Sequence, residues 1–193
     1  MGSFFCFRSL SNLATFCTFI SLLLLVGCAK YSDEIQANLT KLTTTKSCSG
    51  CNLTGVELVS MDLMGANLTG ANLTGANLNR VNHRGADLTN ANLTNANLTN
   101  ATLVKIKFIN ADLSHAKLSY ANLNQSEIFN VLLVDAHMNS AKIINSKISN
   151  SDLTKANLYR TNLTGTKLSK VKFQDAVFCK TIMPSGQDDS GCK

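Results

Sequence analysis

The strongest constraint on this chain is a period of five residues that runs from Leu53 to Phe178 without a change of register. Every fifth residue in this stretch, here called a centre, is large and apolar in 25 of 26 positions, and His83 is the exception. Two residues before each centre stands a second series of mostly small residues, such as Ala66 and Ala91. The remaining positions are polar: Asn or Asp, then Thr or Ser, then Gly or Asn.

Neither regular secondary structure can place all of these centres on one side. Five residues advance an α-helix by about 140° beyond a full turn, and an odd step sends successive strand side chains to opposite faces. A chain that turns a corner after each quintet solves the problem, because every centre then points to one axis. Stacked coils pair the backbone groups of neighbouring sides, and Gly or Asn suits the corners. The period therefore predicts a β-solenoid with a filled interior.

The quintet pattern A-[ND]-L-[TS]-[GN], clearest at residues 66–70 and 91–95, resembles that of the pentapeptide-repeat family. This resemblance implies an all-β fold, namely a right-handed quadrilateral β-helix with 20 residues per coil. Residues 48–178 would then form about 6.5 coils, because 26 centres at four per coil give that number. The family has no catalytic residues and no cofactor to carry over to this chain, so we expect neither.

The first part of the chain reads as a targeting segment. Residues 1–27 combine Arg8 with a mostly apolar run, and the sequence Leu25-Val26-Gly27-Cys28 resembles a bacterial lipoprotein signal whose Cys28 becomes lipidated. An uncleaved anchor helix and an ordinary signal peptide are the alternatives. Ala29 after the cysteine favours, by resemblance to enterobacterial sorting, the periplasmic face of the outer membrane. Residues 28–47 would hold a tether and a short capping helix from Ser32 or Asp33 to about Leu42.

Four cysteines remain beyond the targeting segment and Cys28, namely Cys48, Cys51, Cys179 and Cys192. An even number of cysteines in an exported chain favours disulfides, with Cys179–Cys192 closing a loop in a C-terminal capping segment, residues 179–193. Cys48 and Cys51 either pair or simply fill inward positions. A zinc site is disfavoured because the two pairs would lie at opposite ends of the solenoid, so we expect no metal.

Three departures from the repeat are candidate functional features. His83 occupies a centre, where it is either a ligand or pH-sensitive joint, or a core residue that is hydrogen-bonded or turned outward. Apolar residues at outward positions form a predicted interaction patch that a partner, including a second copy of the chain, could cover; sequence drift is the alternative. The patch residues are Ile109, Phe129, Leu132 and Val134. Residues 101–180 also carry eleven basic and five acidic side chains.

These features favour a non-enzymatic structural or protein-interaction module, tethered to a bacterial envelope membrane by lipid, with an envelope protein or polymer as partner. Some pentapeptide-repeat proteins mimic DNA and protect topoisomerases, which is the alternative function. That role needs an acidic surface, whereas this chain has a formal net charge of +6, so we expect no nucleic-acid-related role. No catalytic triad, carboxylate pair or phosphate loop stands out.

Overall fold

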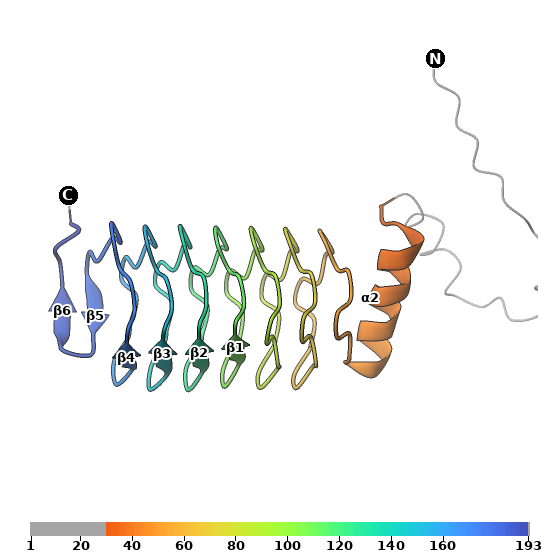
Figure 1. Cartoon of the computed structure of the whole chain (residues 1–193), viewed down its shortest axis with the longest axis horizontal. Helices are drawn as coiled ribbons and strands as arrows, with labels where there is room; N and C mark the ends of the chain where they lie inside the picture. The colour runs from red at the N-terminus through yellow and green to blue at the C-terminus, as the bar shows by residue number, and fades with distance from the viewer. Residues whose placement is uncertain (1–29, 193) are drawn as a thin grey trace, which may run out of the picture. The chain divides into compact units, whose positions relative to one another are not determined.

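Helix α2, a series of stacked coils and a terminal hairpin follow one another in the computed structural model, which describes residues 30–192. They belong to one unit that begins at Asp33. Figure 1 shows α2 at one end of the stack and the hairpin at the other. The elements are α2 (Asp33–Thr45), β1 (Lys107–Ile109), β2 (Glu127–Phe129), β3 (Lys147–Ser149), β4 (Lys167–Ser169), β5 (Thr181–Met183) and β6 (Gly186–Asp188).

The coils are joined by parallel backbone pairing between residues 20 apart. Strands β1, β2, β3 and β4 form one parallel sheet in this register, and isolated bridges such as Asn52↔Asn72 repeat it on the other sides. Each side contributes so few residues that most of the solenoid consists of single bridges. The described coils therefore form an all-β solenoid, as the period of five predicted.

The interior is filled by the two inward series. Every centre from Leu53 to Leu163 is buried, and alanines such as Ala66 and Ala91 fill the small positions between them. Burial of each large apolar side chain contributes about 1.5–3 kcal/mol, which the ordering of the chain largely offsets. The centres of the last coil, Leu168, Phe173 and Phe178, are only partly buried because no further complete coil covers them.

The corners explain the polar positions of the repeat. Each fifth residue from position 50 to position 180 has a φ between 52° and 68°, in the left-handed region that Gly and Asn adopt most readily. At most corners the backbone also closes a tight turn, as where Ala66 N donates to Leu63 O at 3.0 Å. The Asn or Asp before a centre accepts from the backbone two residues on, as Asn92 Oδ1 does from Thr94 N at 2.9 Å. Such side-chain turns are typical of Asn and Asp.

Serine and threonine replace alanine at several inward positions of the second half, where they remain buried. The hydroxyl of Ser126 donates to Leu103 O at 2.9 Å, and that of Thr161 donates to Met138 O at 2.7 Å. Both acceptors lie 23 residues earlier, in the preceding coil. These hydroxyls are therefore satisfied inside the core and tie adjacent coils together.

The two ends of the stack differ in construction. At the N-terminal end, Lys46 has a φ of 54° and ends α2, which extends to Thr45 rather than to about Leu42. The helix buries Leu42, and Asn38 Nδ2 donates to Asn52 O at 3.1 Å.

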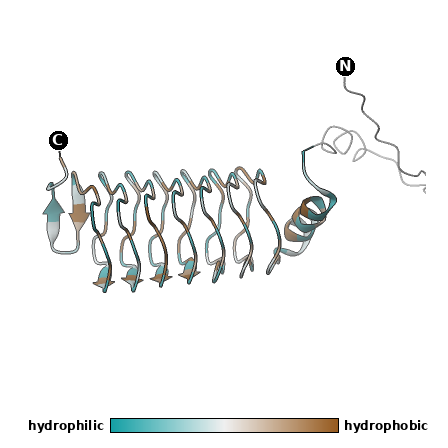
Figure 2. Cartoon of the chain, turned by 45° about the horizontal axis from the view of Figure 1, so that its top comes forward, coloured by the Kyte–Doolittle hydropathy of each residue, from teal (hydrophilic) through white to brown (hydrophobic). Residues whose placement is uncertain are grey.

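At the C-terminal end, β5 and β6 pair antiparallel, and Ile182 of β5 also bridges Asn162 of the preceding coil. Figure 2 shows β5 as largely hydrophobic and β6 as hydrophilic. The stack thus ends on a polar strand, a composition that discourages edge-to-edge association.

Candidate functional site on the outer surface of the coil

The predicted interaction patch lies around the corner at Asn130. Ile109 and Phe129 are paired neighbours on β1 and β2, and Phe129 is 41% exposed. Leu132 follows the corner and is 46% exposed, whereas Ile109 and Val134 are half-buried.

Carboxylates limit the apolar area of this patch. Leu132 is bridged on one side to Asp112 and on the other to Asp152. The backbone and side chain of Thr154 lower the pKa of Asp152 by hydrogen bonding, and Lys172 also lowers it, so this carboxylate stays charged at neutral pH. The four residues form a small apolar surface bordered by negative charge.

The cysteines form two pairs at disulfide distance. The Sγ atoms of Cys48 and Cys51 lie 2.02 Å apart, and those of Cys179 and Cys192 lie 2.06 Å apart. The first pair is at the start of the coils, where Cys48 is fully buried, and the second joins the last coil to the segment after β6. Within residues 30–192 no group of His, Cys, Asp and Glu side chains is arranged to hold a metal ion. Cys28, the predicted lipidation site, lies outside the described residues, as does the predicted signal segment 1–27.

His83 is fully buried at its centre position, between Leu63 and Leu103 of the adjacent coils. Neither Nδ1 nor Nε2 has a hydrogen-bond partner among the residues that the structure describes. The imidazole is thus neither hydrogen-bonded nor turned outward, which were the two structural alternatives. Burial lowers the pKa of His83 from 6.5 to about 4, because the charged form loses its solvation.

A shallow groove that the sequence did not reveal lies on another side of the coils. Its volume is about 420 Å³. We call this side the Lys117 side, and its bridged outward residues run Glu57, Asn77, Asn97, Lys117, His137, Asn157 and Val177. The groove is lined by Thr99, Lys117, Ser119, Tyr120, His137 and Asn139.

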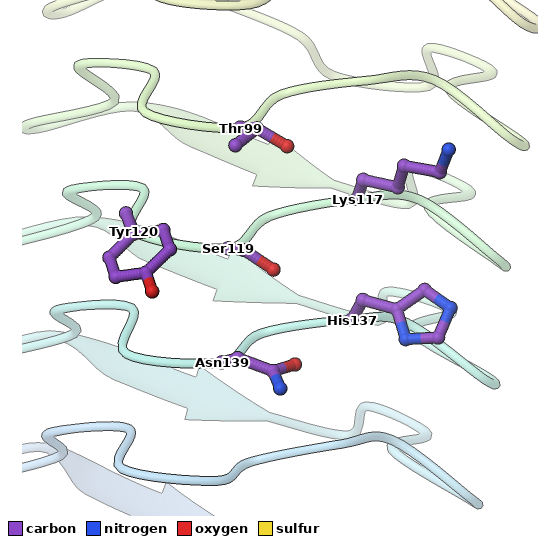
Figure 3. Close-up of a pocket in the computed structure, with 6 residues that line it drawn as sticks. All are labelled: Thr99, Lys117, Ser119, Tyr120, His137 and Asn139. Carbon is purple, nitrogen blue, oxygen red and sulfur yellow. The ribbon is translucent and has the colours of Figure 1, made fainter.

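The lining residues form three rows along the stack (Figure 3). The middle row is Thr99, Ser119 and Asn139; Lys117 and His137 lie to one side of it, and Tyr120 to the other. Tyr120 stands at a corner, with a φ of 62°, and is 64% exposed. A lone tyrosine at a corner gives no sequence signal, and the rows become visible only when residues 20 apart are aligned.

Charge is distributed unevenly around the solenoid. From Asn77 onward, the Lys117 side and the corner row that follows it contain no Asp or Glu. The basic residues there are Arg80, Lys117, Arg160 and Lys180. The corner row that precedes this side does carry carboxylates, of which Asp135 Oδ2 lies 3.9 Å from His115 Nδ1. The Lys117 side is therefore a positively charged strip with hydroxyl and amide groups.

No helix within residues 30–192 has both the length and the apolar character needed to cross a membrane.

The carboxylate pKa shifts are downward where they are resolved. Asp62 is one case, because the backbone N–H of Met64 donates to it. Such carboxylates accept hydrogen bonds from the backbone of a turn. Because their pKa is lowered, they are ionised at neutral pH and are poorly suited to act as general acids.

Two comparisons with known proteins relate this architecture to others. The chain is similar to the solved structure of HetL, a pentapeptide repeat protein involved in heterocyst differentiation regulation from the cyanobacterium Nostoc sp. strain PCC 7120. Identity is 28%, over 72% of this chain and 73% of that one, with a TM-score of 0.45. The chain is likewise similar to Rfr23, a pentapeptide repeat protein from the cyanobacterium Cyanothece 51142. Identity is 25%, over 80% of this chain and 99% of that one, with a TM-score of 0.30.

The chain is also similar to QnrB1, a plasmid-mediated fluoroquinolone resistance protein, at 17% identity. The match covers 63% of this chain and 69% of that one, with a TM-score of 0.47. A comparison with curated proteins found no match. The family model Pentapeptide repeats matches in overlapping segments, residues 47–82, 71–108, 106–143, 136–175 and 146–183. These segments together span most of the chain and coincide with the coils, so the chain belongs to the pentapeptide repeat family.

Proposed function

We propose that this protein is a non-enzymatic interaction module of the bacterial cell envelope, held at a membrane by lipid on Cys28. The observation that carries the proposal is the filled interior. Centres from Leu53 to Leu163 are buried, so the described coils offer recognition surfaces on the outside and no deep cleft for a substrate. Such a solenoid suits the display of flat sides to a partner.

The cysteines support an extracytoplasmic location. All four cysteines within residues 30–192 are arranged in two pairs at disulfide distance. Disulfides persist in oxidising compartments such as the periplasm and are rare in the cytoplasm. The lipoprotein-like sequence around Cys28 supplies the accompanying route to a membrane, and its Ala29 favours the periplasmic face of the outer membrane.

The domain organisation forms part of the proposal. Residues 1–27 are the signal peptide, residues 28–47 a tether with α2 as the N-terminal cap, and residues 179–193 the C-terminal cap. Residues 48–178 make a right-handed β-helix of about 6.5 coils. Support for the caps comes from the buried Leu42 of α2 and from the antiparallel pairing of β5 with β6.

A DNA-mimicking, topoisomerase-protecting role is the alternative function. Mimicry of duplex DNA requires a dense negative charge, about one per 1.7 Å of helix axis. The chain has a net charge of +6, and the Lys117 side lacks carboxylates from Asn77 onward. Electrostatics therefore oppose this role.

Crosslinking and co-purification from native envelopes test the interaction function. We expect Phe129→Glu to lose the partner, because it places a charge in the exposed apolar patch. Met64→Glu is the matched control, since Met64 is 52% exposed but lies on another side. An unchanged set of partners for Phe129→Glu would contradict a role of the patch.

Mass spectrometry tests the anchor separately. The wild-type protein should carry the mass of a lipid that Cys28→Ser lacks, and the variant should leave the membrane fraction. A wild-type protein without the lipid mass would refute the anchor.

A further inference from the structure

The groove on the Lys117 side combines three kinds of chemistry within one short stretch of the stack. Tyr120 exposes an aromatic ring at its edge, the middle row offers hydroxyl and amide groups, and Lys117 and His137 supply nitrogen donors opposite the ring. Figure 3 shows the hydroxyl and amide groups of the middle row, which repeat from coil to coil, with Tyr120 on one side of them and Lys117 and His137 on the other.

The rows continue beyond the groove along the same side. Tyr159 follows Asn139 in the middle row, one coil further on, and the guanidinium of Arg160 lies 5.1 Å from the centre of its ring. Adjacent coils stack at about 4.8 Å, so Ser119 and Tyr159, two coils apart in this row, are separated by about 10 Å along the axis. Tyr120, which follows Ser119, and Tyr159 are therefore two aromatic rings in different rows, two coils apart, a spacing on the scale of an extended polymer's units.

This combination matches the surface of an acidic sugar. A pyranose ring presents C–H groups on one face, which pack on the negative face of an aromatic ring, and hydroxyls around its edge, which pair with amide and hydroxyl side chains. A uronate carboxylate would pair with an ammonium such as that of Lys117. No Asp or Glu lies on this side itself from Asn77 onward, so the carboxylates that border the path of such a chain are those of the preceding corner row, such as Asp135.

Single-stranded nucleic acid also stacks on aromatic rings, but it carries a phosphate at every nucleotide and is bound by grooves lined densely with cations. Here neutral Thr99, Ser119 and Asn139 outnumber the one lysine of the groove. The donor set favours a ligand with many hydroxyls and fewer charges.

We propose that the Lys117 side binds a linear anionic polysaccharide, with Tyr120 stacking on a sugar ring and Lys117 pairing with a carboxylate. The proposal deepens the function above and rests on it, since it names the chemistry of a polymer partner for an envelope interaction module. The groove is a second surface, distinct from the Phe129 patch.

Calorimetric titration of the purified full chain with polygalacturonate tests this assignment, with neutral dextran as the comparison polymer. We expect binding of polygalacturonate and not of dextran. Tyr120→Ala should raise the dissociation constant about tenfold, and Lys117→Gln should raise it and weaken its salt dependence. Lys147→Gln, an exposed lysine of β3 on another side, is the matched control and should stay within about twofold of wild type.

Equal binding of dextran, or wild-type affinity in both Tyr120→Ala and Lys117→Gln, would overturn the proposal. Tighter binding of oligo-dT than of polygalacturonate, lost in the same variants, would overturn it in favour of nucleic acid. Both variants change exposed side chains, and circular dichroism shows whether each is folded. Failure here leaves the crosslinking result at Phe129 unaffected, so the two proposals fail separately.

Discussion

Replacement of the buried His83 should make the protein both more stable and less sensitive to acid. The unfolded chain binds a proton at this imidazole below about pH 6.5, whereas the folded protein binds it only below about pH 4. Between these values the unfolded state holds more protons, so the free energy of unfolding falls as the pH falls. Leu63 and Leu103 occupy the same inward position in the adjacent coils, so leucine is the replacement that best suits this site, and the test variant is His83→Leu.

The magnitude follows from the two pKa values. Each pH unit between 6.5 and about 4 is worth about 1.36 kcal/mol, so the full penalty is about 3 kcal/mol, of which about 2.5 kcal/mol applies at pH 4.5. At pH 7.5 this contribution is absent, but two buried nitrogens without partners among residues 30–192 remain, which cost about 1–3 kcal/mol. His83→Leu should therefore gain about 1–3 kcal/mol at pH 7.5 and about 2.5 kcal/mol more at pH 4.5.

Urea denaturation followed by far-UV circular dichroism at pH 7.5, 6.5, 5.5 and 4.5 measures the difference between wild type and variant. Carboxylates titrate in both proteins, so the difference isolates His83. His137→Gln is the control for removal of an imidazole that is exposed. A difference between wild type and His83→Leu that stays constant from pH 7.5 to pH 4.5 would refute the reasoning.

Three further substitutions probe the coil, each measured as the free energy of unfolding in urea. Thr161→Val removes the hydrogen bond to Met138 O and should cost about 1 kcal/mol. Thr54→Val, at an exposed position, should cost little. Equal losses in the two variants would show that the buried hydroxyl of Thr161 does not stabilise the coil. Asn95→Ala should cost about 1 kcal/mol because Asn95 has a φ of 61°, and Asn95→Gly should be near neutral; the reverse order would contradict the corner geometry. Replacement of both Cys179 and Cys192 by Ala should cost about 3 kcal/mol by freeing a loop with a sequence separation of 13, and no loss on mutation or reduction would show that the pair does not form.

The solenoid could be predicted from the sequence because one spacing decides it. A period of five excludes the helix and the flat strand, so the inward direction of Leu53 and of the centres after it followed without any energy estimate. The corners were equally readable, since Gly and Asn concentrate there. Lys105 and Tyr120 adopt the same φ region at corners, which shows that the stack imposes the conformation even where the residue does not favour it.

The surface was less predictable because it depends on alignment between coils. Phe129 and Leu132 were recognised as outward from their register alone, and they are exposed. The groove escaped notice because Thr99, Ser119 and Asn139 are ordinary repeat residues that acquire meaning only as neighbours. The state of His83 was also missed, since whether an inward imidazole finds a hydrogen-bond partner depends on the coil above and below it. The lipid anchor at Cys28 stays a prediction.

The pairing of each residue with the one 20 positions later has a consequence for how such a chain can change in length. Insertion of a single quintet between Lys117 and His137 would keep the interior intact but rotate everything downstream by a quarter turn, so that these two residues would no longer share a row. Insertion of four quintets would lengthen the molecule and leave every row continuous. Natural variation that preserves a binding surface here should therefore come in whole coils, and shorter insertions should be confined to the two ends.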